Sequence, residues 1–183
     1  MSLDQQVLAS PDDGSLGPLL RIADDRLPPG AGYGRHEHRA VDVVAVVVDG
    51  EVRHRWDDDA VVRAGDVAVL RAGSGLGHDE VAGPDGARVL QCYLRASAPE
   101  EDPTHEVLAG AGGWVDLRRP DARLWLARIP DGETVDVPAG LLVALPASGP
   151  AVVAAQDGGR WAGAATVCVW QLETTRPSWA ADR

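Results

Sequence analysis

The chain has 183 residues, a formal net charge of −11 and 45% hydrophobic residues, while aromatic residues make up only 4%. This length suffices for one large or two small domains with a buried core. All 17 basic residues are arginine, and the acidic balance argues against direct binding of DNA or RNA. No apolar run approaches the ~20 residues of a membrane span, and the N-terminus lacks the features of a signal peptide, so we expect a cytoplasmic protein without membrane contact.

The first half of the chain is a succession of short Val-rich runs separated by turn residues. Residues 1–18 are polar and interrupted by Gly and Pro, so we expect a loose lead-in there. Short runs rich in β-branched residues and bounded by Gly, Pro and Asp are typical of strands. The predicted strands cover 41–48, 51–56, 60–63, 67–71, 78–82 and 87–95. Asp49-Gly50 predicts a two-residue hairpin turn, and 83–86 predicts another turn.

A second strand-rich stretch follows an acidic segment bounded by prolines. This segment, 99–103, begins a predicted linker over 99–112. The strands predicted after it cover 114–117, 123–129, 134–137, 141–145, 151–155 and 166–172. No amphipathic helical pattern occurs among the predicted strands of the first half. We therefore predict an all-β protein, a sandwich or barrel, with an N-terminal domain over 1–98 and a shorter C-terminal β unit over 113–183.

Three of the five histidines occur in two tripeptides, residues 36–38 (HEH) and 78–80 (HDE). Residues i and i+2 of a strand project from the same face, so each tripeptide would present two potential ligands together. On neighbouring strands of a barrel, three imidazoles and one carboxylate would then meet at one point. We predict one divalent first-row metal ion, with coordination positions open for substrate or O₂, bound by His36, His38, His78 and Glu80. Fe(II) suits such a set, and Zn, Ni, Cu or Mn can use the same ligands.

Three further polar residues are candidates for the surroundings of this site. Asp42 has the same parity as the first histidine pair, so it is interpreted either as a group that orients a ligand imidazole or adds a ligand, or as an exposed edge residue. His54 shares a strand face with apolar residues, which favours a hydrogen-bonded core histidine over a ligand. His105 falls in the predicted linker, where we expect it to be solvated.

Two segments resemble known sequence motifs. Residues 30–39, GAGYGRHEHR, followed by Asp42 and Gly50, resemble the first motif of the cupin superfamily. Residues 65–80, GDVAVLRAGSGLGHDE, closely resemble the second motif of the pirin family, which carries G-D, A-G-x-G and H-x-E in this order. The resemblance implies a bicupin, in which a double-stranded β-helix (jelly-roll) barrel binds the metal and a shorter, degenerate cupin-like unit follows. Carried over by position, it implies a non-haem iron with the ligands His36, His38, His78 and Glu80.

The same resemblance implies an activity. Some bacterial pirins resemble quercetin 2,3-dioxygenases, so we expect an Fe(II) dioxygenase that uses O₂ on quercetin-type flavonols or other enolisable small molecules. Glu80 is the expected catalytic base for the hydroxyl proton of the substrate. The alternative is a non-enzymatic module that senses iron or redox state and binds a protein partner, which the animal nuclear members of the family resemble.

Overall fold

The structure is a computed structural model that describes residues 3–11, 13–56 and 59–174. All regular secondary structure within these residues is β-strand, which confirms the predicted all-β class. In this described part of the chain no apolar helix of membrane-spanning length is present. The chain forms two compact units. The first comprises Met1–Ala9 and Arg21–Ala111, and the second comprises Ser10–Leu20 and Gly112–Arg183.

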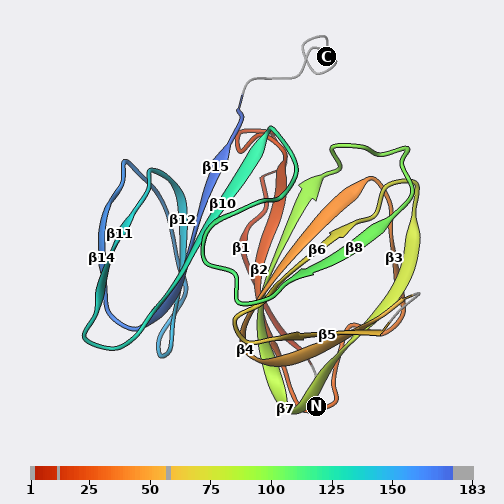
Figure 1. Cartoon of the computed structure of the whole chain (residues 1–183), viewed down its shortest axis with the longest axis horizontal. Helices are drawn as coiled ribbons and strands as arrows, with labels where there is room; N and C mark the ends of the chain where they lie inside the picture. Colours follow the sequence, from red (N-terminus) through yellow and green to blue (C-terminus); the bar gives the residue numbers. More distant parts are fainter. Residues whose placement is uncertain (1–2, 12, 57–58, 175–183) are drawn as a thin grey trace. The chain divides into compact units, whose positions relative to one another are not determined.

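The first unit is built on an eight-stranded sheet with the strand order β1-β2-β7-β4-β6-β8, in which β3 pairs with β7 and β5 pairs with β4. The strands are β1 (Asp4–Ala9), β2 (Leu19–Leu27), β3 (His36–His38), β4 (Val41–Arg55), β5 (Asp59–Arg63), β6 (Val67–Arg71), β7 (Leu76–Arg95) and β8 (Thr104–Leu108). In Figure 1, β3 lies at one side of this unit and β1 and β2 lie at the other.

The two longest strands, β4 and β7, form the centre of the sheet and carry most residues of the candidate site. They pair antiparallel from end to end, with register shifts next to Asp49 and Gly50. The hairpin turn predicted at Asp49-Gly50 is therefore wrong, and the turn predicted at 83–86 also lies inside a strand, β7. Gly50 has a φ of +70° and faces the carbonyl oxygen of Gly86 closely. A glycine there allows a bulge that bends the strand without reversing it.

Small β-branched and methyl side chains fill the interior of the first unit. One buried cluster comprises Leu27, Ala45, Val47, Val52, Val62, Ala68, Ala82 and Val89. A buried ion pair also joins β7 to β2: Arg88 Nε donates to Asp24 Oδ1 at 2.9 Å, and Arg88 Nη2 donates to Asp24 Oδ2 at 2.7 Å. This two-pronged geometry satisfies both buried charges and holds the two strands in one register.

Two strands of the first unit lie where the sequence predicts irregular chain. β1 pairs with β2 inside the predicted loose lead-in, and β8 pairs with β6 inside the segment 99–112 that was predicted as a linker. Both stand at the ends of the strand order. An edge strand is half solvated and polar, so its own sequence carries little strand signal and its neighbour supplies the hydrogen bonds.

The second unit contains a five-stranded sheet in the order β13-β12-β15-β10-β9 and a two-stranded sheet of β11 and β14. Its strands are β9 (Gly113–Val115), β10 (Ala122–Ile129), β11 (Thr134–Val137), β12 (Gly140–Pro146), β13 (Val152–Gln156), β14 (Gly159–Ala162) and β15 (Ala165–Leu172). A cluster of apolar residues from five of these strands, which includes Ile129, Leu142 and Val167, forms its core. The sequence of this unit contains no histidine.

Candidate metal centre

The pairing of β3 with β7 brings the histidines of the two tripeptides together. His36 lies directly opposite His78, and His38 lies opposite Leu76. The ring centroids of His36 and His78 are 4.4 Å apart, and those of His38 and His78 are 5.0 Å apart. The Nε2 atoms of His36 and His38 are 3.0 Å apart. Three imidazoles from two neighbouring strands therefore converge.

Burial keeps two of these imidazoles neutral. Burial, reinforced by the neighbouring histidines, lowers the pKa of His78 to about 3 and that of His38 to about 4. The Nε2 atom of His78 is buried and has no hydrogen-bond partner among the described residues. A buried polar atom without a partner is unfavourable, so a ligand at this nitrogen would stabilise the site.

Glu80 follows His78 by two residues on β7 and is buried. Its Oε1 lies 3.5 Å from His78 Nε2, and its Oε2 accepts a hydrogen bond of 2.9 Å from Gln91 Nε2. Burial raises the pKa of Glu80 to about 7. The two carboxylate oxygens therefore have different surroundings, with one held by an amide and the other turned toward an imidazole.

The candidate ligands form two overlapping triplets. In the outer triplet, one nitrogen each of His36, His38 and His78 lies within 4.8 Å of the others. In the inner triplet, the same holds for one ligand atom each of His54, His78 and Glu80. Of the four ligands predicted from the sequence, the structure thus brings the three histidines together and places Glu80 beside His78 on the side of His54.

Asp42 does not belong to either triplet within the described part of the chain. The parity argument assumes that strand alternation continues from the first histidine pair, but Ala40 between β3 and β4 has a φ of +54° and interrupts it. Val43, the residue that follows Asp42 on β4, packs with Leu76 beside the site. Because successive side chains of a strand point to opposite faces, Asp42 lies on the other face of β4.

His54 and His105 complete the inner side of the site, which the sequence analysis did not foresee. The register of β4 and β7 sets His54 opposite Glu80, and His54 Nε2 lies 3.9 Å from Glu80 Oε2. His54 Nδ1 lies 3.1 Å from Nε2 of His105, which is half-buried on β8. The expectation of a buried, hydrogen-bonded His54 is confirmed, whereas the expectation of a solvated His105 is wrong because β8 pairs into the sheet.

Polar and aromatic residues that the sequence analysis did not single out surround these triplets. The Tyr33 hydroxyl donates to Asp25 Oδ2 at 2.6 Å, and the Tyr33 ring lies 6.1 Å from that of His36 between centroids. The Tyr93 ring lies 5.8 Å from that of His38. Gln91 is a buried polar residue within the apolar run 89–94 of β7, and a polar residue in such a run is a signal by which it could be found from the sequence.

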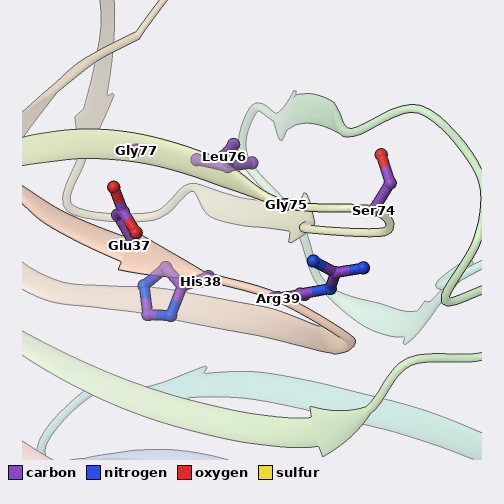
Figure 2. Close-up of a pocket in the computed structure, with 7 residues that line it drawn as sticks. All are labelled: Glu37, His38, Arg39, Ser74, Gly75, Leu76 and Gly77. Carbon is purple, nitrogen blue, oxygen red and sulfur yellow. The ribbon is translucent and has the colours of Figure 1, made fainter.

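A groove of about 600 Å³ opens beside His38. It is lined by Glu37, His38, Arg39, Ser74, Gly75, Leu76 and Gly77 (Figure 2). Figure 2 shows Glu37 and His38 on opposite sides of β3, with Arg39 after them and Ser74 on the turn that precedes β7. Glu37 and Arg39 are exposed, so this ligand histidine borders a charged, solvent-open surface.

The residues present fit a first-row divalent metal. Imidazole nitrogens with a carboxylate suit Fe, Zn, Ni and Cu ions. Ligand atoms about 2.1 Å from one ion lie roughly 3–4 Å from one another. The separation of 3.0 Å between the Nε2 atoms of His36 and His38 agrees with this spacing. The unpartnered Nε2 of His78 provides a third nitrogen, and Glu80 provides negative charge next to it.

Two solved structures of bacterial proteins share the fold of this chain. The bacterial pirin YhhW from Escherichia coli in complex with nickel(II) matches with a TM-score of 0.71 and 20% identity, over 93% of this chain and 92% of that chain. A quercetin 2,3-dioxygenase from Acinetobacter baumannii matches with a TM-score of 0.67 and 17% identity, over 97% and 88%. At these identities the likeness shows a shared fold alone.

Sequence comparisons relate the N-terminal part of the chain to one family. The family model described as Pirin matches residues 8–94, which include both triplets. A Pirin-like protein of Caulobacter vibrioides is 28% identical over 144 residues, or 68% of this chain and 62% of that protein. The Quercetin 2,3-dioxygenase of Escherichia coli K12 is 31% identical over 86 residues, or 46% and 37%. Residues 8–94 of the chain are therefore similar to the pirin family, and the chain spans less than two thirds of the length of either relative.

Proposed function

We propose that the protein is a metal-dependent dioxygenase that uses Fe(II) and O₂ on quercetin-type flavonols or other enolisable small molecules. The observation that carries the proposal is the convergence of His36, His38 and His78 next to the buried carboxylate of Glu80. Relatives named quercetin 2,3-dioxygenase support the substrate class. The nickel(II) complex of the Escherichia coli pirin supports a metal in this fold, and Zn, Ni, Cu and Mn are the alternatives to iron.

Each residue of the site has a role in this proposal. The metal, when bound, polarises the oxygens of the substrate and orients both reactants. His36, His38 and His78 hold it. Glu80 takes the hydroxyl proton of the flavonol, and a pKa raised to about 7 by burial suits a group that accepts and returns a proton near neutral pH. Gln91 holds one carboxylate oxygen in place and leaves the other facing His78.

The walls of the site support a planar aromatic substrate. Tyr93 lies against His38 on one side and packs on the apolar cluster that contains Val43 and Leu76. Tyr33 lies against His36, and its hydroxyl is held by Asp25. Aromatic rings stack or meet edge to face with other rings, and a hydroxyl fixed by a carboxylate presents a defined dipole. These walls would bind the rings of a flavonol and exclude water from the ligands.

Oxygen consumption tests this proposal. Protein loaded anaerobically with Fe(II) should consume O₂ when quercetin is added. Glu80→Gln should lower turnover by about 10²-fold or more, with a much smaller loss of quercetin affinity, because an amide accepts a hydrogen bond but takes no proton. Glu37→Gln is the matched control, since Glu37 projects from the opposite side of β3. Absence of O₂ uptake by iron-loaded, reduced protein across a panel of flavonols would refute the enzyme.

One observation favours a second candidate, an iron- or redox-sensing module that binds a protein partner. The groove beside His38 is lined by exposed charged residues, Glu37 and Arg39, rather than by an enclosed apolar wall. A charged open surface next to a metal ligand suits a partner that reads the metal state. This candidate takes precedence if the flavonol panel gives no turnover while metal binding is stoichiometric.

A further inference from the structure

The inner triplet has the properties of a metal position in its own right. His54 and Glu80 are direct partners in the pairing of β4 with β7, and His78 precedes Glu80 by two residues on the same face. The three residues are 4%, 1% and 2% exposed, respectively. Their ligand atoms all lie within 4.8 Å of one another. Two imidazoles and a carboxylate at this spacing have the ligand atoms that a divalent metal ion requires.

Hydrogen bonding within the inner triplet does not account for its polar atoms. His54 Nε2 and Glu80 Oε2 are 3.9 Å apart, too far for a hydrogen bond but within the span of two ligands on one ion. His78 Nε2 has no hydrogen-bond partner among the described residues and faces Glu80 Oε1 at 3.5 Å. A shared cation would join these atoms.

His105 supplies the orienting contact that ligand histidines usually have. A histidine that binds a metal through one ring nitrogen commonly donates the N–H of its other nitrogen to an acceptor, which fixes its tautomer. His54 Nδ1 lies 3.1 Å from His105 Nε2. If His54 donates this hydrogen bond, the lone pair of its Nε2 faces Glu80 and His78. The acceptor for the non-ligating nitrogen of His54 therefore comes from His105 on β8.

We propose that His54, His78 and Glu80 form an inner metal position, with His105 as a positioning residue that orients His54. This position lies beside the outer triplet of His36, His38 and His78 and goes beyond the proposed function, since it needs no turnover. The His78 side chain is common to both triplets, so we treat the two positions as alternatives for a single ion. The inner position is enclosed, whereas the outer one borders the groove at His38.

Removal of the outer ligands tests the inner position directly with Co(II) alone as the probe. The double variant His36→Ala/His38→Ala should still bind one Co(II) per chain, with reduced affinity. Its proton NMR spectrum should show two hyperfine-shifted, exchangeable imidazole N–H signals, from His54 and His78. His105→Phe in this background should weaken Co(II) binding by about 10–100-fold, the usual effect of losing the partner of a ligand histidine.

Three results would overturn the inner position. The first is that the double variant binds no Co(II). The second is that its spectrum shows only one shifted imidazole N–H signal. The third is that a further His54→Gln substitution leaves its affinity for Co(II) unchanged. The signal count requires no change at His54, so it decides the question even if His54→Gln fails to fold. Because these readouts involve metal alone, their failure leaves the proposed dioxygenase standing, and absence of O₂ uptake leaves the inner position standing.

Discussion

His78 is the residue that both triplets share. We therefore predict that His78→Ala abolishes stoichiometric metal binding, because either set of ligands is reduced to two. Glu37→Ala should leave the metal content unchanged, since Glu37 neighbours the ligands in sequence but projects away from them. Elemental analysis of protein purified without chelators measures both. Unchanged metal content in His78→Ala would contradict the assignment of the site.

Buried titratable groups make the stability of the metal-free protein depend on pH. Burial lowers the pKa of His54 and His78 to about 3, from 6.5, so their contribution to stability is present above pH 6.5 and lost as the pH falls. Glu80 acts in the opposite sense: its pKa is raised from 4.5 to about 7, so its contribution is present below pH 4.5 and lost as the pH rises.

The two histidines outweigh the single carboxyl group on the acid side of neutrality. Between about pH 6 and pH 5 the unfolded chain binds more protons than the folded chain at these two histidines and at His38, whose pKa is lowered to about 4, and this excess exceeds the opposite difference at Glu80. Acidification therefore lowers the free energy of unfolding, and Glu80→Gln, which removes the opposing group, should have a steeper slope. Thermal melts in the presence of a chelator measure this, and equal slopes in the two proteins would contradict it.

At the scale of the elements, the bulge in β4 sets the face that His54 presents. The register shift between Val47 and Asp49 adds one residue to β4 just before Gly50, which returns Val52 and His54 to the interior, opposite Ala82 and Glu80. We predict that Gly50→Ala destabilises the protein by more than the roughly 1–2 kcal/mol that a left-handed φ costs a residue with a Cβ, because the new methyl group would also collide with the Gly86 carbonyl oxygen.

Gly30→Ala is the matched control for this bulge. Gly30 has a φ of +67°, close to the +70° of Gly50, but an added Cβ there meets nothing within 4 Å. The control should therefore lose only the conformational term, about 1–2 kcal/mol. Urea denaturation of both variants gives the comparison, and an equal loss in the two would show that close packing at the bulge contributes nothing.

For the whole molecule, metal binding should raise the melting temperature through the first unit. All five histidines belong to this unit. An ion that binds only the folded state at 100 times its dissociation constant stabilises that state by about 2.7 kcal/mol. Calorimetry with and without Ni(II) should show the increase in the wild type and none in His78→Ala. A rise of equal size in both proteins would place the ion elsewhere in the chain.

The sequence by itself determined the all-β class of the fold and the two histidines of β3 that belong to the outer triplet. Val-rich runs at short spacing predict strands because β-branched side chains pack on a pleated surface, and most central strands lie where these runs do. The alternation of a strand also predicts that His36 and His38 project together, which depends only on local geometry. Edge strands such as β1 and β8 escaped prediction, because their hydrogen bonds come from a neighbour rather than from their own pattern.

Only the tertiary structure decided which polar residues meet. Asp49-Gly50 has the composition of a hairpin turn, yet pairing with β7 makes it a bulge, because a glycine with positive φ serves either purpose. Positive φ at Ala40 likewise interrupts the alternation from which the sequence predicted that Asp42 shares a face with His36 and His38. His54 and His105 are far apart in the sequence, and their contact beside Glu80 follows from long-range strand pairing, which no local pattern encodes.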